Sequence, residues 1–111
     1  SPVIYDAGSD FGVKSNNTGT DLYAFKDIPH GWTAIAFKTY GTGGDTVTFH
    51  AYDMTDGSRT ADGNTGTINS AEVQLASPVA ASSTNFVGLL INPNNTGDRI
   101  YSGYIKIERK K

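Results

Sequence analysis

The chain of 111 residues contains no cysteine. This absence excludes disulfide bonds, thiolate metal sites and thiol nucleophiles. A small domain without covalent cross-links depends on its hydrophobic core, or on association with other chains, for stability. The length suits one domain with one core. We therefore predict a single domain over residues 1–111, in which Ser1–Gly19 forms an extended N-terminal arm.

The chain also lacks an excess of positive charge and any long apolar segment. Nine Lys and Arg residues stand against eleven Asp and Glu residues, which gives a net charge of −2. Binding to the backbone of DNA or RNA relies on a positive surface, so the sequence predicts no nucleic-acid partner. No apolar segment approaches the roughly 20 residues that a membrane span requires. We therefore expect no membrane partner.

Helical periodicity is nearly absent, because no window of about eleven or more residues has apolar positions at three-and-four spacing between caps. Alternation with a period of two is common instead, and it predicts strands. In Trp32–Tyr40 it places Phe37 with Ile35 on one face and Ala34 on the other. In residues 46–52 one face is apolar and predicted to face the core: Val47, Phe49 and Ala51. The other face is predicted to cover the outside of a sheet, open to water or a partner: Thr46, Thr48, His50 and Tyr52.

Seven segments have the alternation or the apolar run of a strand. They are Val3–Tyr5, Leu22–Lys26, Trp32–Tyr40, Thr46–Met54, Glu72–Leu75, Asn85–Asn92 and Arg99–Arg109. Clusters of Gly, Asn, Asp and Pro, which favour turns, separate them. About seven to eight short strands divided in this way predict an all-β fold, an antiparallel β-sandwich of the jelly-roll or Ig-like kind. We expect Thr55–Ser70 to be a long polar loop and Pro78 to end the strand before it.

Residue types that carry catalysis are present without the spacing that catalysis uses. Most Asp residues fall in predicted turns, where Asp commonly bonds its own backbone. The sequence has no nucleophile elbow, phosphate-binding loop or HExxH motif. Asp53–Gly57 lacks the spacing of an EF-hand and is best explained as a turn. Calcium binding by this loop through carbonyl groups and Asp56 or Asp62 is a weaker alternative. We therefore predict that the protein is not an enzyme and has no catalytic residue, metal site or cofactor.

Aromatic residues make up 11% of the chain and supply candidates for a binding surface. Carbohydrate sites use exposed aromatic side chains beside polar groups. The candidate contacts with a partner or a glycan are Trp32, Tyr40, His50, Tyr52 and Tyr104. These residues fall on several predicted strands, so the sequence does not show whether they converge.

Two stretches resemble small β-sandwich modules of tailed-phage virion proteins, especially those of marine phages. Trp32–Arg59 (WTAIAFKTYGTGGDTVTFHAYDMTDGSR) is similar to their unit of strand, Gly/Thr turn, strand and Asp-Gly turn. Asn85–Arg109 (NFVGLLINPNNTGDRIYSGYIKIER) looks like their closing hairpin. Together the two stretches cover about half of the sequence.

The resemblance implies a non-enzymatic virion structural protein, a capsid decoration or a tail or fibre component, that acts through protein–protein contacts. The implied partners are other virion proteins and further copies of the chain. The implied location is the virion, after assembly in the host cytoplasm. A carbohydrate-binding module, with a glycan as partner, is the alternative function that the aromatic residues leave open.

Overall fold

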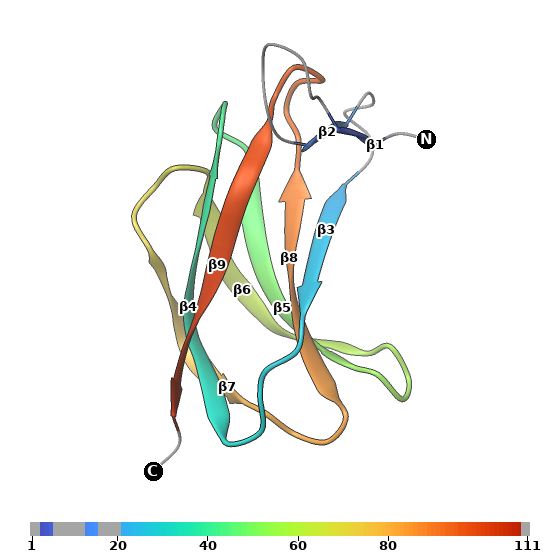
Figure 1. The fold of residues 1–111 in the computed structure, drawn as a ribbon, viewed down its shortest axis with the longest axis vertical. Coiled ribbons are helices and arrows are strands. Elements are labelled where there is room, and N and C mark those ends of the chain that lie inside the picture. Colours follow the sequence, from blue (N-terminus) through green and yellow to red (C-terminus); the bar gives the residue numbers. More distant parts are fainter. Residues whose placement is uncertain (1–2, 6–12, 16–20, 110–111) are drawn as a thin grey trace.

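The computed structural model describes residues 3–5, 13–15 and 21–109, and its strands form two layers (Figure 1). The strands are β1 Val3–Tyr5, β2 Val13–Ser15, β3 Leu22–Lys26, β4 Trp32–Gly41, β5 Thr46–Asp53, β6 Arg59–Thr67, β7 Val73–Ala80, β8 Asn85–Asn92 and β9 Ile100–Arg109. One sheet has the order β1-β2-β9-β4-β7 and the other the order β3-β8-β5-β6. The pairings are antiparallel. The predicted all-β antiparallel sandwich is confirmed. Among the described residues no helix could span a membrane.

The core lies between the two sheets and is filled by the inward side of alternating strands. The three residues of β5 that were predicted to face the core, Val47, Phe49 and Ala51, are all buried. Asn85–Asn92 was predicted to be a strand, and it forms β8, which lies between β3 and β5. Its inward residues Val87, Leu89 and Ile91 pack in the same core.

Strand β4 contains an irregularity that strict alternation does not predict. Its register shifts between Ala34 and Ala36 against both neighbours, β7 and β9. A bulge of this kind adds one residue and reverses the alternation beyond it. Ala34 and Phe37 therefore both belong to the core. The prediction that they lie on opposite faces was wrong.

Strand β6 occupies most of Thr55–Ser70, so the prediction of a long loop there was wrong. The strand was missed because its inward positions lack apolar side chains. Asn64 is buried, and its Oδ1 accepts a hydrogen bond of 2.9 Å from the backbone N–H of Ala76. Two residues later, Gly66 lies directly under Val73. Without apolar residues at these positions the segment shows no alternation for sequence analysis to detect.

Strand β7 continues past the point where the sequence suggested its end. Pro78 was expected to terminate the strand, but β7 runs to Ala80. Proline is tolerated on edge strands and at bulges because it has no N–H for the ladder. Both conditions hold here: β7 is the last strand of its sheet, and Pro78 falls in the irregular part between the pairs Ala36–Gln74 and Ala34–Val79.

Most of the predicted arm Ser1–Gly19 lies outside the described residues. Its described parts are β1 and β2, which pair with each other. Strand β2 joins β9 through the pair Val13–Ile100. Val3–Tyr5 was predicted to be an edge strand, and β1 does end the five-stranded sheet.

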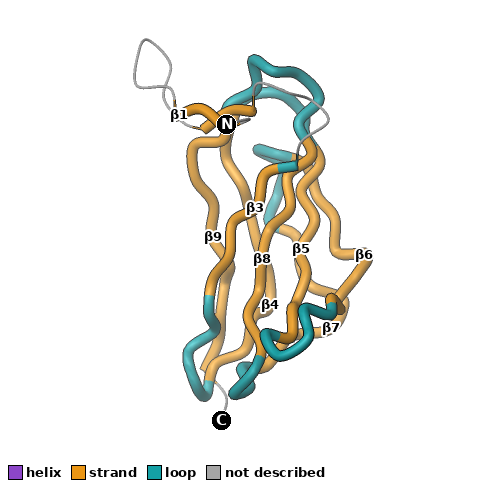
Figure 2. The backbone as a smooth tube through the Cα atoms, turned by 90° about the vertical axis from the view of Figure 1, so that its right-hand side faces the viewer, coloured by secondary structure: helices purple, strands orange, loops and turns teal. Residues whose placement is uncertain are grey.

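The two long sides of the sandwich differ. On one side β6 and β7 contact each other and close the gap between the sheets. On the other side the backbones of β3 and β9 run next to each other (Figure 2), and residues of both strands line a pocket. The closed side depends on Gly66, because a Cβ there would overlap Cγ2 of Val73.

We expect Gly66→Ala to lower the free energy of unfolding by about 1–3 kcal/mol, the usual cost of overpacking. Val73 is β-branched and has few rotamers with which to avoid the new methyl group. Chemical denaturation followed by circular dichroism measures the change. In a Val73→Ala background the same substitution should cost clearly less. Equal costs in both backgrounds would contradict the steric explanation.

Candidate functional site: an aromatic face on the four-stranded sheet

The outer side of the four-stranded sheet carries a group of contacting aromatic side chains, here called the aromatic face. Residues two apart on a strand point to the same side of the sheet, so neighbouring strands bring their outward residues together. The aromatic face consists of Tyr23 and Phe25 of β3, Phe86 of β8, and His50 and Tyr52 of β5. The register places Tyr52 opposite Phe86.

The rings of the aromatic face are linked by direct contacts. Tyr52 stacks on Phe86 with the ring centres 5.1 Å apart, and Phe25 meets both rings edge-on at 5.6 Å. Tyr23 stacks on Phe25 at 5.8 Å, and His50 lies edge-on to Tyr52 at 6.1 Å. Aromatic pairs of this kind contribute about 0.5–1.5 kcal/mol each beyond the burial of their area. The rings therefore hold one another in a fixed arrangement.

Exposure increases across the aromatic face toward the edge of the sheet. His50 is only 5% exposed, because its neighbours cover it, although the sequence predicted that it would face water or a partner. Tyr23 and Phe25, on the edge strand β3, are 53% and 58% exposed. Clustered apolar side chains that remain open to water mark interaction sites on many proteins.

Gly88 makes the ring arrangement possible. It lies in β8 opposite both Phe25 and His50. A Cβ at this position would come within 2.9 Å of Cδ1 of Phe25 and 3.0 Å of Cε2 of Tyr52. The missing side chain leaves the space in which these two rings meet.

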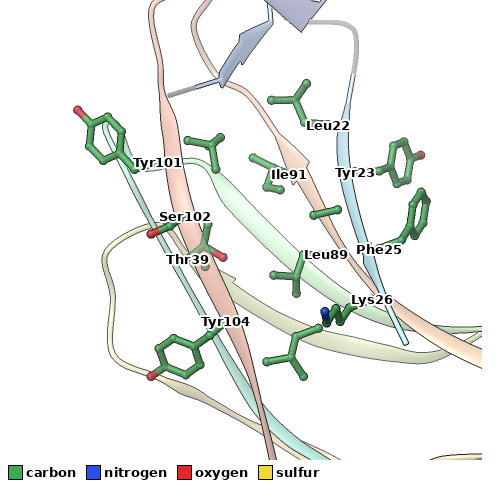
Figure 3. Close-up of a pocket in the computed structure, with 14 residues that line it drawn as sticks. Leu22, Tyr23, Phe25, Lys26, Thr39, Leu89, Ile91, Tyr101, Ser102 and Tyr104 are labelled. Atoms are coloured by element: carbon green, nitrogen blue, oxygen red, sulfur yellow. The ribbon is translucent and has the colours of Figure 1, made fainter. Parts of the chain in front are cut away.

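A groove runs beside the aromatic face, between β3 and β9 on the open side of the sandwich (Figure 3). Its volume is about 630 Å³. Leu89 and Ile91 project into the groove, whereas Tyr23 and Phe25 border it with their rings on the other side of β3. Strand β3 thus separates an apolar groove from an aromatic surface.

The edges of both strands that border the groove are largely unpaired. In the described part of the chain, β3 pairs only with β8. Strand β9 pairs with β4 along its length, and with β2 only at Ile100. Unpaired edges of this kind expose backbone N–H and C=O groups that can pair with another strand.

The other predicted contact residues lie away from the aromatic face. Tyr40 and Tyr104 are on the outer side of the five-stranded sheet, on β4 and β9. Lys38 Nζ lies 4.9 Å from the ring centre of Tyr40. Trp32 is half-buried and packs against the core. The structure therefore divides the five predicted residues among three places: His50 and Tyr52 on the aromatic face, Tyr40 and Tyr104 on neighbouring strands of the other sheet, and Trp32 beside the core.

Three members of the aromatic face were not among the predicted contacts: Tyr23, Phe25 and Phe86. A signal for the first two exists in the segment LYAFK, because both sides of that strand are apolar. A strand with two apolar sides needs cover on both. No comparable signal exists for Phe86, because its place beside Tyr52 depends on the pairing of β8 with β5.

The turn at Asp53–Gly57 uses its acidic side chains locally. Asp53 Oδ1 accepts hydrogen bonds from the N–H and the hydroxyl of Thr55, at 2.8 and 2.6 Å. Asp56 Oδ1 accepts one from the N–H of Ser58 at 2.8 Å, and this bond lowers the pKa of Asp56. These bonds are the ones expected of Asp residues that stabilise a turn.

Asp45 has the most strongly altered environment among the acidic residues of the described part. It is fully buried at the end of the turn between β4 and β5. Burial raises its pKa to about 6, because the ionised form loses its hydration. The N–H of Asn94 opposes this change by donating to Oδ1, and the neighbouring carboxyl group of Asp98 adds to it.

The hydrogen bond from the Tyr104 hydroxyl to Glu72 Oε2, 2.6 Å long, allows a test by titration. It raises the pKa of Tyr104 to about 12 and is the main cause of the lowered pKa of Glu72. The bond thus stabilises the fold only within a range of pH. It is lost when the pH falls through the lowered pKa of Glu72, and when the pH rises through about 12.

In Tyr104→Phe we expect the pKa of Glu72 to rise toward its ordinary value, because the donor to the ionised carboxylate is removed. NMR titration of the Glu72 carboxyl carbon measures this pKa. Tyr40→Phe is the matched control, since Tyr40 does not bond Glu72, and it should leave the pKa where it is. An unchanged pKa in Tyr104→Phe would show that the hydrogen bond does not form in solution.

Comparison with models of protein families, with curated proteins and with solved structures finds no match for this chain. The resemblance to virion modules stays a prediction that depends on the residues that suggested it. The comparisons supply no relative whose activity might be carried over. The chain is thus an antiparallel β-sandwich to which these comparisons assign no family.

Proposed function

We propose that this protein is a non-enzymatic structural module that binds other proteins through its aromatic face. The observation that carries the proposal is the pair Tyr23 and Phe25, more than half exposed at the edge of a cluster of contacting rings. Aromatic residues are enriched in protein interfaces and supply many of the side chains on which binding depends. Because the rings already hold one another in place, a partner would bind them at a small cost in side-chain entropy.

The position of the aromatic face on an edge strand supports a protein as the partner. A protein that covers Tyr23 and Phe25 also reaches the unpaired edge of β3, which otherwise invites uncontrolled pairing. A second copy of the chain is the simplest such partner, since a two-fold axis brings the same surface of both copies together. Placement in a virion, as a capsid decoration or as a tail or fibre part, comes from the resemblance and is part of this proposal.

A carbohydrate-binding module is the second candidate, and the exposed rings of Tyr23 and Phe25 favour it. Sugars stack on the open face of an aromatic ring. Tyr23 and Phe25, however, stack on each other with an angle of 14° between their planes. Each ring therefore covers part of the face that a sugar would use, which favours a protein partner over a glycan.

The double substitution of Tyr23 and Phe25 by Ser tests the proposal. We expect it to weaken self-association by about 30-fold, which corresponds to about 2 kcal/mol, the loss typical of central interface residues. Sedimentation velocity over a concentration series measures the association. Tyr101→Ser is the matched control, because Tyr101 is 51% exposed and lies on β9, outside the aromatic face. Circular dichroism verifies that both variants remain folded.

Two results would contradict the proposal. One is a wild-type protein that stays monomeric at its solubility limit and does not co-sediment with capsids, tails or fibres of tailed phages. The other is association that the double substitution and Tyr101→Ser leave equally strong. Binding on a glycan array that the double substitution abolishes, without any protein association, would establish the carbohydrate-binding alternative instead.

A further inference from the structure

Two carboxyl groups meet at one end of the sandwich, outside the aromatic face. Asp45 closes the turn between β4 and β5, and Asp98 lies in the connection between β8 and β9. The side chain of Asp45 is fully buried, and the carboxyl group of Asp98 contacts it. The fold thus brings together two acidic groups from residues that are far apart in the sequence.

Each of the two carboxyl groups has one oxygen without a hydrogen-bond donor. Oδ1 of Asp45 accepts a bond of 2.7 Å from the N–H of Asn94. Oδ2 of Asp45 and Oδ2 of Asp98 are buried and have no hydrogen-bond partner in the described part of the chain. Buried polar atoms nearly always have a partner, so two such atoms from contacting residues indicate a missing one.

The missing partner is a metal cation or a proton that the two carboxyl groups share. The buried carboxylate of Asp45 and the half-buried carboxylate of Asp98 repel each other when both are ionised, and their buried oxygens lose hydration. Within the described residues no ion pair involves either group. The guanidinium of Arg99, next to Asp98 in the chain, donates from Nη1 to the carbonyl oxygen of Gly97. The described part of the chain thus provides oxygen atoms for a cation and no cationic side chain that pairs with them.

The turn between β4 and β5 is shaped around the carboxyl group of Asp98. A Cβ at Gly43 would come within 2.7–2.8 Å of the carboxyl carbon and both oxygens of Asp98. Gly43 also has a φ of +74°, which favours glycine. The turn therefore allows Asp98 to approach its backbone closely. The neighbouring carbonyl oxygen of Gly44 accepts a long bond of 3.4 Å from Nδ2 of Asn94, the residue whose N–H donates to Asp45.

We propose that Asp45 and Asp98 bind one Ca²⁺ ion, which links the β4–β5 turn to the β8–β9 connection. Calcium takes six to eight oxygen ligands in flexible geometry and accepts carboxylates, backbone carbonyls and water together. Magnesium demands near-ideal octahedral geometry and keeps several waters, which suits a fully buried carboxylate less well. Two carboxylates are few for a calcium site, so we expect a dissociation constant of about 10⁻⁴–10⁻³ M.

Calcium titration of the chelator-stripped wild-type protein at neutral pH is the direct test. We expect isothermal titration calorimetry to show one Ca²⁺ per chain. The melting temperature should rise with Ca²⁺ and level off, because an ion that binds only the folded state stabilises it. Mg²⁺, and KCl at matched ionic strength, should produce smaller shifts. The absence of saturable Ca²⁺ binding would overturn the proposal, as would Mg²⁺ binding tighter than Ca²⁺. If the two carboxyl groups share a proton and bind no metal ion, the titration will show no saturable Ca²⁺ binding.

The substitutions Asp45→Asn and Asp98→Asn locate the site. Each should weaken Ca²⁺ binding by at least about tenfold, the usual result of altering a metal site. Each should also leave the calcium-free melting temperature at or above the wild-type value, since repulsion between the carboxylates is removed. Asp56→Asn, which changes an acidic turn residue outside this pair, is the matched control and should bind Ca²⁺ as the wild type does. Wild-type affinity in both Asp45→Asn and Asp98→Asn would overturn the proposal.

If Asp45→Asn fails to fold, Asp98→Asn carries the test alone, because Asp98 is the more exposed of the two residues. The result does not depend on the proposed function. The calcium titration uses proteins in which the aromatic face is unchanged. Self-association is measured without added calcium. Failure of one proposal is thus distinguishable from failure of the other.

Discussion

The stacked rings of Phe37 and Phe49 join the two sheets at the centre of the sandwich. Their centres are 5.9 Å apart, and both side chains are fully buried. Each ring lies on an interior strand of its sheet, Phe37 on β4 and Phe49 on β5. Because these strands follow each other in the chain, one contact fixes both the spacing of the sheets and the turn that ends at Asp45. The bulge before Phe37 is what directs this ring inward, so the central contact depends on a break in regular pairing.

The two long sides of the sandwich, away from this central contact, differ from each other. Gly66 lets β6 approach β7 and closes one side. The opposite side stays open at β3, whose Leu22 faces the core while Tyr23 and Phe25 face outward. A strand with apolar residues on both sides is ordinarily covered on both sides. In the isolated chain β3 is covered on one side only. The composition of β3 is thus itself an argument that its outer side is covered when the protein functions.

Alternation in the sequence predicted the strands whose inner residues are apolar and whose pairing is regular. Strands β5 and β8 pair with each other in regular register, and their inward residues Val47, Phe49 and Val87 fill the core directly. Strand β6 meets neither, because its inward positions hold Asn64 and Gly66, and its register shifts against β5. The bulge in β4 left no mark in the sequence, because Ala34 and Ala36 fit either side of a strand equally well. Local pattern therefore identified the fold class and could not identify each strand.

The aromatic face was harder to predict than the fold, because it forms between strands far apart in the sequence. Phe25, Tyr52 and Phe86 come together only through the order β3-β8-β5. Tyr52 was predicted to be a contact residue, but Phe25 and Phe86, which contact its ring, were not. Similarly, Asp45 and Asp98 were expected to be turn residues, since nothing local shows that their carboxyl groups meet. Sites built from pairing between distant strands require the register, which sequence alone does not supply.

Gly88 offers a further argument that the arrangement of the rings matters. Glycine in the interior of a strand lowers stability, because it has no side chain to pack and loses more backbone entropy on folding. At this position the core gains nothing in return, since residue 88 shares the outer side of the sheet with Phe86. The space that it leaves is used by the rings of Phe25 and Tyr52, and by the backbone oxygen of Ala24, 3.2 Å from where a Cβ would lie. Strand β8 thus has glycine at a position where a larger residue would disturb the aromatic face. This indicates that the face contributes something other than stability.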